Sequence, residues 1–286
     1  MSISTVMVIG AGQMGGGIAQ VMASAGHKTY LNDINPDIVN ARLDFIKKLL
    51  TKDVSKNKIT EEQKGATIAN LIPSTQMGDA AGCDLVVEAI VENMDIKGKI
   101  FRTLDDICPS DCILASNTSS LPITEIAAFT KRPEKVIGMH FMNPVPVMKL
   151  VEIIRGLATS DETYSVIRDE SIKLNKSPVE VRDVPGFISN RVLQIMINEA
   201  IYCLYEGVAS VEDIDTVMKL GMNHPMGPLQ LADFIGLDTV LSIMNTLYEG
   251  YADSKYRPCP LLRQYVKAGW LGKKSCRGFY RYDGGY

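Results

Sequence analysis

A glycine-rich run near the start of the chain has the spacing of a phosphate-binding turn. Gly10-Ala11-Gly12-Gln13-Met14-Gly15 fits the pattern G-x-G-x-x-G, directly follows an apolar run and opens a segment with helical spacing. The first glycine allows a tight turn, the second lets a pyrophosphate approach the backbone, and the third lets the helix pack closely on the strand. The N–H groups at the start of that helix would stabilise the phosphates. The run therefore predicts a dinucleotide site.

An acidic residue indicates which dinucleotide this site would take. Asp33 ends the second expected strand, about 20 positions beyond the glycine turn, where a carboxylate accepts hydrogen bonds from the adenosine ribose hydroxyls. Its charge would repel a 2′-phosphate, and no arginine follows it closely to offset that repulsion. We therefore expect NAD rather than NADP. The alternative is a turn whose glycines serve only packing, with Asp33 capping a loop.

Three histidines are the candidates for acid–base chemistry, because the unperturbed pKa of histidine lies near neutral pH. His27 begins an expected strand and is predicted to be structural. His224 lies in a loop rich in Gly and Pro, where a packing role is the favoured interpretation. His140 lies at the carboxyl end of the expected strand Val136–Phe141, at the edge where open α/β sheets bind ligands. It is the candidate for chemistry, with a satisfied core histidine as the alternative.

These residues need a scaffold that brings strand ends together. Over residues 1–183, short apolar runs alternate with helical patterns, as in stacked βα units. A long helix is expected from Pro36 to about Leu50, with the proline at a favourable first position. We expect an α/β fold with a Rossmann-type, doubly wound parallel sheet, whose strands lie at 6–9, 28–31, 84–89, 113–116, 136–141, 149–154 and 177–181.

The remainder of the chain has a different pattern. From Phe187 onward apolar residues recur at three- and four-residue spacing, which predicts an all-helical C-terminal domain with helices at 211–220, 228–234 and 239–248. The change falls at Asp183-Val184-Pro185-Gly186, so we place the domains at 1–183 and 184–286. Residues 272–286, rich in Gly, Tyr, Lys and Arg, are expected to form a surface tail packed across the molecule.

Composition argues against several other classes. A net charge of −3 does not suit a general nucleic-acid binder, which needs clustered Lys and Arg. No apolar run approaches the roughly 20 residues that cross a bilayer, and the first residues do not resemble a targeting segment. The six cysteines are scattered without zinc-ligand spacing, which favours reduced thiols and no metal. We expect a cytoplasmic protein without nucleic-acid or membrane partners.

Several longer motifs resemble the 3-hydroxyacyl-CoA dehydrogenase family, and they occur in order over essentially the whole chain. They are Asp84-Leu85-Val86-Val87-Glu88-Ala89-Ile90-Val91-Glu92-Asn93, Ser116-Asn117-Thr118-Ser119-Ser120-Leu121, the run from His140-Phe141-Met142-Asn143-Pro144 to Glu152, Asp183-Val184-Pro185-Gly186-Phe187-Ile188-Ser189-Asn190-Arg191, and His224-Pro225-Met226-Gly227-Pro228. The length and the lack of a fused hydratase module resemble the stand-alone bacterial, 3-hydroxybutyryl-CoA type of this family.

The resemblance implies roles for four residues. His140 would be the general base that removes the 3-hydroxyl proton, and the acid in the reverse direction. Glu152 would pair with the other ring nitrogen and fix the tautomer; without the resemblance, a surface acid on an edge strand is the favoured interpretation. Ser119 and Asn190 would hydrogen-bond the substrate oxygen. Otherwise Ser119 is a helix N-cap candidate and Asn190 an interior helix residue.

The resemblance also implies the cofactor contacts. Lys97 and Lys274 would otherwise be taken as ordinary solvated charges. The full set expected around NAD is Gly10, Gly12, Gln13, Met14, Gly15, Asp33, Glu92, Lys97, Asn117, Ser119, Asn143 and Lys274.

A basic cluster suits the phosphates of coenzyme A. Lys48, Lys52 and Lys56 recur every four residues and share one face if their helix continues, where like charges repel unless an anion neutralises them. With the resemblance, Lys52 and Lys56 become candidate contacts of an acyl-CoA substrate; a solvated face is the alternative. The resemblance further implies acetoacetyl-CoA and (S)-3-hydroxybutyryl-CoA as the reacting pair, a place in fatty acid or butanoate metabolism, and a homo-oligomer formed through the helical domain.

Two other functions fit part of the same pattern. A related dehydrogenase acting on free hydroxy acids or sugar acids would use the same His–Glu pair but would not need the lysine face; comparing free acids with thioesters distinguishes them. A structural protein that retains NAD binding is the other alternative. The presence together of Ser119, His140, Glu152 and Asn190 argues against it, because a structural role does not need all four.

Overall fold

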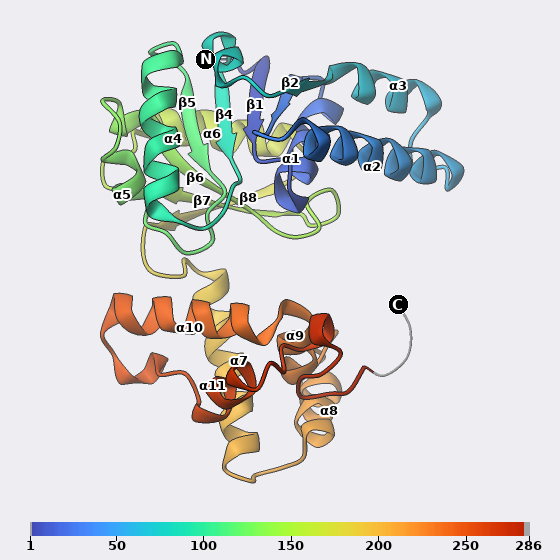
Figure 1. Ribbon diagram of the computed structural model, residues 1–286, viewed down its shortest axis with the longest axis vertical. Coiled ribbons are helices and arrows are strands. Elements are labelled where there is room, and N and C mark those ends of the chain that lie inside the picture. The colour runs from blue at the N-terminus through green and yellow to red at the C-terminus, as the bar shows by residue number, and fades with distance from the viewer. Residues whose placement is uncertain (1, 283–286) are drawn as a thin grey trace. The chain divides into compact units, whose positions relative to one another are not determined.

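The computed structural model describes residues 2–282, which belong to two compact units, Met1–Val184 and Pro185–Tyr286 (Figure 1). The first unit contains a β-sheet with helices on both faces, and the second contains helices. The predicted fold class, a Rossmann-type α/β unit followed by a helical unit, is confirmed.

One sheet of eight strands forms the centre of the first unit. Its spatial order is β3-β2-β1-β4-β5-β6-β7-β8. Since β1 pairs with β2 on one side and β4 on the other, the chain changes winding direction there, and ligands of such sheets bind beside that point. The strands are β1 (Thr5–Ile9), β2 (Lys28–Asn32), β3 (Leu71–Ser74), β4 (Leu85–Glu88), β5 (Ile113–Ser116), β6 (Val136–Phe141), β7 (Leu150–Arg155) and β8 (Ser177–Arg182).

All seven predicted strands are present, each with its ends within one residue of the prediction. The missed strand, β3, is short and contains Pro73, which lacks the N–H that a central strand needs; β3 lies at the edge of the sheet, where proline is tolerated. The long helix begins at Pro36 as predicted, capped by the Asn35 side chain, which accepts from the Asp37 N–H at 2.9 Å. It continues to Ser55, beyond the predicted end at Leu50.

The expectation of a parallel sheet is wrong for one pair of strands. β7 runs antiparallel to β6, whereas the other neighbouring strands are parallel. The connection from Phe141 to Leu150 is too short for a helical crossover, which needs a dozen or more residues, so the chain must return antiparallel. This reversal sets His140 directly opposite Glu152 in the strand register.

Helices cover both faces of the sheet. Ile18 and Met22 of α1 join Ile167 and Leu174 at α6 in one buried apolar cluster with strand residues, while α4 covers the opposite face (Figure 1). The helices are α1 (Gln13–Ser24), α2 (Pro36–Ser55), α3 (Glu61–Asn70), α4 (Met94–Ile107), α5 (Ile123–Ala127) and α6 (Asp161–Lys173), with short 3₁₀ helices at Met77–Gly82 and Pro133–Lys135.

The second unit packs its helices around its own apolar cluster, which includes Ile197, Leu229, Val240 and Leu262. Its helices are α7 (Ser189–Tyr205), α8 (Val211–Gly221), α9 (Pro228–Ile235), α10 (Leu237–Tyr251) and α11 (Pro260–Lys267), with 3₁₀ turns at Ser254–Tyr256 and Lys273–Ser275. The three helices predicted here are present, and α11 was missed.

The described part of the predicted tail packs against the second unit. Phe279 and Tyr280 pack against the apolar cluster of the second unit. The buried Asp233 carboxylate accepts the backbone N–H groups of both residues, at 3.0 and 2.9 Å, which attaches the segment to α9. Residues 283–286 of the predicted tail lie outside the described residues.

Candidate active site

The glycine turn has the backbone geometry that its pattern predicts. Gly10 has a φ of +99°, and a Cβ there would lie 2.5 Å from the Ala89 carbonyl oxygen. A Cβ on Gly15 would lie 1.7 Å from the Gly10 carbonyl oxygen, so only glycine lets α1 start this close to the strand. A Cβ on the exposed Gly12 would meet no heavy atom within 4 Å. The turn thus leaves open space at the second glycine, and this fits a pyrophosphate at the start of α1.

Asp33 is attached to this turn. Its Oδ2 accepts the Ala11 N–H at 2.9 Å, and its Oδ1 accepts the Asn35 N–H at 3.3 Å. The carboxylate is half-buried, and each oxygen has a further lone pair available for a ribose hydroxyl. Asp33 therefore holds the glycine turn as well as carrying the charge expected to disfavour a 2′-phosphate.

His140 and Glu152 form a buried pair across the antiparallel strands. His140 Nδ1 lies 2.8 Å from Glu152 Oε2, and the two side chains are only 7% and 2% exposed. Glu152 lies on β7, which has β6 and β8 as neighbours, so the alternative of a solvated acid on an edge strand does not hold. The carboxylate fixes which ring nitrogen faces it and leaves Nε2 on the other side of the ring.

The segment after β5 brings a hydroxyl to that second nitrogen. Ser119 Oγ lies 3.0 Å from His140 Nε2 and is half-buried. Asn117, two residues earlier, uses its Oδ1 to accept the Phe141 N–H at 2.9 Å. The ends of β5 and β6 are therefore fastened together, and Ser119, His140 and Glu152 form one continuous series of contacts.

Glu92 organises the Ser119 segment. Its Oε1 accepts the Thr118 hydroxyl at 2.6 Å and the backbone N–H groups of Ser119 and Ser120 at 3.0 Å each. Burial alone would raise the pKa of Glu92, but the nearby Lys97 charge and these hydrogen bonds outweigh it and lower the pKa below its ordinary value. Glu92 was predicted as a cofactor contact; in the protein it also holds the serine-rich turn in place.

Lys97 is not the solvated charge that composition alone suggests. Its side chain is 1% exposed, and Nζ lies 2.6 Å from Glu88 Oε1 and 3.4 Å from Glu92 Oε2. Glu88 is fully buried and also accepts the Ser116 hydroxyl at 2.7 Å. Sequence reasoning gave Glu88 no role of its own. Its position could have indicated a role, because Glu88 ends the apolar strand Leu85–Glu88 and a buried charge there is costly unless it has a partner.

The connection between β6 and β7 also contacts the glycine helix. Gln13 Nε2 donates to Asn143 Oδ1 at 3.0 Å, so two predicted cofactor residues from distant parts of the chain lie side by side. Met14 is half-buried and packs against the core cluster. Together with the glycine turn and the Ser119 segment, these residues collect at the carboxyl ends of the parallel strands.

Two further predicted site residues lie in the second unit and are described within it. Asn190 and Lys274 belong to the second unit, where Asn190 is the second residue of α7 and Lys274 Nζ donates to Asp238 Oδ2 at 2.7 Å.

Lys48, Lys52 and Lys56 are exposed, and none forms an ion pair with a carboxylate of residues 2–282. Lys48 and Lys52 lie on α2, which continues past its predicted end at Leu50, and Lys56 is the residue that caps it.

Residues 2–282 were expected to hold neither a metal ion nor a membrane span, and two properties of these residues concern such sites. Within residues 2–282 no group of three His, Cys, Asp or Glu side chains is arranged to hold a metal ion. None of the helices in that range has the length and apolar character of a membrane span. His27 lies buried against Glu170, with Nε2 2.6 Å from Oε1, away from the group around His140.

A doubly wound sheet with this glycine turn defines a dinucleotide-binding dehydrogenase domain of the Rossmann type. Residues 5–184 match the family model described as "3-hydroxyacyl-CoA dehydrogenase, NAD binding domain", and residues 186–282 match "3-hydroxyacyl-CoA dehydrogenase, C-terminal domain". The chain belongs to the 3-hydroxyacyl-CoA dehydrogenase family, and its cofactor is NAD.

Relatives of the chain align over almost its full length. It is 63% identical over 283 residues to a "Probable 3-hydroxybutyryl-CoA dehydrogenase" of Bacillus subtilis, covering 99% of both chains. It is 55% identical to a "3-hydroxybutyryl-CoA dehydrogenase" of Bradyrhizobium diazoefficiens, covering 99% of this chain and 96% of the relative. The crystal structure of an (S)-3-hydroxybutyryl-CoA dehydrogenase from Ralstonia eutropha superposes with a TM-score of 0.97 at 49% identity, covering 99% and 100% of the two chains.

The buried ion pair yields a first test. Replacing Lys97 by Met leaves the Glu88 carboxylate buried without its counter-charge, and we expect the free energy of unfolding to fall by about 3–5 kcal/mol. In Glu88→Gln combined with Lys97→Met the buried carboxylate is removed as well, and only the partly exposed Glu92 loses an ion pair, so much of that loss should be recovered. Urea unfolding measures both variants, with the exposed Lys99→Met on the same helix as the control. A Lys97→Met variant as stable as Lys99→Met would contradict the account.

Proposed function

We propose that the chain interconverts acetoacetyl-CoA and (S)-3-hydroxybutyryl-CoA with NAD as the hydride carrier, a reaction of fatty acid and butanoate metabolism. The observation that carries the proposal is the buried His140–Glu152 pair with Ser119 at the other ring nitrogen, at the strand ends where the cofactor turn also lies. The relatives named for this substrate support it, because their identity to the chain extends over both units.

The cofactor part of the proposal rests on the turn at Gly10, Gly12 and Gly15. Its residues fit NAD because the second glycine faces open space beside the start of α1, where backbone N–H groups attract phosphate. When bound, NAD accepts a hydride from C3 of the hydroxyacyl group, and NADH returns one to the keto group. Asp33 would hold the adenosine ribose. Gln13, Met14, Asn117, Asn143, Glu92, Lys97 and Lys274 complete the proposed cofactor set.

His140 performs the proton transfer in this proposal. Because the Glu152 carboxylate accepts from Nδ1–H, the lone pair of the neutral ring lies on Nε2. Nε2 removes the proton of the 3-hydroxyl group as hydride leaves C3, and returns it when the ketone is reduced. The negative Glu152 then stabilises the imidazolium that forms, as the orienting acid does in a catalytic triad.

Ser119 marks the place of the reacting oxygen. Its hydroxyl lies 3.0 Å from His140 Nε2, so an oxygen that hydrogen-bonds Ser119 is also within reach of the base. Asn190 is proposed as a second donor to that oxygen, contributed by the helical domain. In this proposal residues 1–183 bind NAD and supply the base, and residues 184–286 complete the substrate cleft.

The coenzyme A end of the substrate is assigned to the exposed lysines of α2 and its cap. Lys52 and Lys56, with Lys48 beside them, carry positive charges that no neighbouring carboxylate neutralises among the described residues. A phosphate-bearing substrate would relieve their mutual repulsion. This assignment separates the proposal from a dehydrogenase of free hydroxy acids, which gains nothing from these charges.

Association through the helical domain is part of the same proposal. An apolar hollow of about 700 Å³ lies between α7 and α8, and exposed apolar side chains, including Val192 and Val217, line it. We propose that a second copy of the chain covers this face. Sedimentation velocity should give a dimer or a multiple of dimers, and Val217→Glu should shift it toward monomer. A wild-type monomer at micromolar concentration would contradict this part of the proposal.

Removing the base tests the catalytic assignment. His140→Ala should reduce turnover of acetoacetyl-CoA by roughly 10²–10⁴-fold while NADH binding stays near that of the wild type. Glu152→Gln keeps an acceptor for Nδ1–H but removes the charge, so a smaller loss is expected. Loss of NADH absorbance measures turnover, and His224→Gln is the control histidine variant.

Two results would contradict the proposal in different places. An active wild type with an equally active His140→Ala variant would leave the substrate in place and remove His140 as the base. No wild-type turnover of any acyl-CoA, together with oxidation of free 3-hydroxybutyrate, would replace the thioester substrate by a free hydroxy acid.

A further inference from the structure

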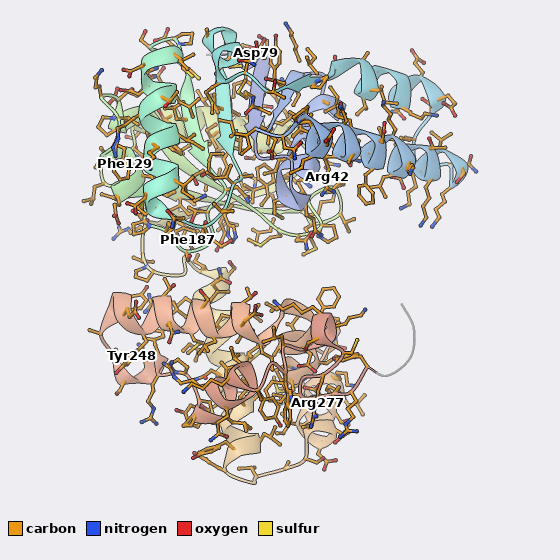
Figure 2. The ribbon with its side chains drawn as sticks, viewed as in Figure 1. Arg42, Asp79, Phe129, Phe187, Tyr248 and Arg277 are labelled. Carbon is orange, nitrogen blue, oxygen red and sulfur yellow. The ribbon has the colours of Figure 1, made fainter. Side chains whose placement is uncertain are left out.

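The two peptide groups on either side of Ala11 are each held by a charged side chain. The Ala11 N–H donates to Asp33 Oδ2 at 2.9 Å, and the Ala11 carbonyl oxygen accepts from Arg42 Nε at 3.1 Å. Asp33 follows β2, whereas Arg42 lies on α2 (Figure 2). Asp33 belongs to the recognised fingerprint of the dinucleotide site. Arg42 does not, and no pattern in the sequence assigned it a role.

The Arg42 contact determines how the next peptide group is oriented. In a planar trans peptide the carbonyl and the N–H point in opposite directions. Because Arg42 holds the Ala11 carbonyl on the α2 side, the Gly12 N–H of the same peptide is turned the other way. Gly12 is exposed and faces open space, and it is the residue that precedes α1, which begins at Gln13. The orientation of this N–H group therefore matters for an anion bound at the start of α1.

A glycine outside the fingerprint makes room for the arginine. A Cβ on Gly16 would lie 2.2 Å from Arg42 Cδ and 2.6 Å from Cγ, both shorter than any real contact. The Gly16 N–H already donates to the Gly12 carbonyl at 3.0 Å, so the backbone at Gly16 belongs to the first turn of α1 and has little freedom to retreat. Glycine at position 16 is thus explained by the path of the Arg42 side chain.

Among residues 2–282, no carboxylate lies within ion-pair distance of the Arg42 guanidinium. The guanidinium donates to the Ala11 carbonyl and lies 5.3 Å from the centre of the Phe45 ring. Phe45 is half-exposed and restricts the guanidinium from one side. An unneutralised cation bonded to the turn adds positive potential where the cofactor phosphates are expected.

We propose that Arg42 is a positioning residue for NAD, which orients the Ala11–Gly12 peptide toward the pyrophosphate, and that Gly16 is the partner this role requires. The inference rests on NAD binding by the glycine turn and not on the identity of the substrate. Its test is therefore a binding measurement made without any acyl-CoA.

Titrating NADH by its fluorescence tests the proposal, first with three variants. Arg42→Met removes the donor and the charge, and NADH binding should weaken on the order of 10-fold, as for loss of one charged hydrogen bond. Arg42→Lys keeps the charge without the Nε donor and should fall between Arg42→Met and the wild type. Arg102→Met is the matched control, because Arg102 also lies on a helix over an aromatic ring, Phe129, but far from the turn in sequence and contacts.

Gly16 provides the independent arm of the experiment. Gly16→Ala should weaken NADH binding in the wild-type background, because the new methyl group displaces Arg42. In the Arg42→Ala background the same substitution should cost little, since the side chain it would meet is gone; the double variant should bind like Arg42→Ala alone. Thermal unfolding of each variant verifies that it is folded.

Turnover measured over a range of NADH concentrations adds a second readout. The kcat of Arg42→Met should stay within about 2-fold of the wild type while its KM for NADH rises, because the residue touches neither the base nor the substrate oxygen. Wild-type NADH affinity in Arg42→Met, or strictly additive effects of the Gly16 and Arg42 substitutions, would overturn the proposal. If the chain bound NADH as described but turned over no acyl-CoA, the proposed substrate would fail and the role of Arg42 would stand.

Discussion

The reversal of chain direction between β6 and β7 is the constraint on which the site depends. The connection between the two strands is too short for a helical crossover, so β7 returns beside β6 and pairs antiparallel with it. Residues opposite each other in such a pair project from the same face of the sheet at close range. His140 and Glu152 occupy one such pair, and their side chains meet at 2.8 Å in a nearly dry environment. The same reversal carries Asn143 to Gln13 of the glycine helix.

Around this pair, each segment that reaches the site is fixed by a hydrogen bond to a charged or amide group. Asn117 fastens the end of β5 to β6, Glu92 holds the turn that carries Ser119, and Lys97 forms ion pairs with Glu92 and with the buried Glu88. Buried charges are costly unless they are paired and hydrogen-bonded, and here every charge named has such partners. These ion pairs and hydrogen bonds reduce the energetic cost of burying the charges. They also fix the positions of the hydroxyl and the ring nitrogen that would meet the reacting oxygen.

The features that could be predicted from the sequence are those encoded by local patterns. Strand periodicity located seven strands, and the glycine spacing with Asp33 indicated the cofactor. The direction of β7 was missed because it depends on the length of a connection, and β3 because a proline interrupts a four-residue run. Glu88 and Arg42 escaped notice since their partners are distant in sequence and only the fold brings them together. The roles of Ser119 and Asn190 came from the family resemblance alone, because neither residue belongs to a pattern with chemical meaning of its own.

In the proposed mechanism Glu152 holds His140 with its proton on Nδ1 and its lone pair on Nε2. Nuclear magnetic resonance of the ¹⁵N-labelled imidazole rings measures this directly, and a chain with three histidines gives a spectrum simple enough to assign by single substitutions. The account predicts that the neutral His140 ring carries its hydrogen on Nδ1, and that Glu152→Ala shifts the population toward the other tautomer. A ring with its hydrogen on Nε2 and a bare Nδ1 facing Glu152 would contradict the account.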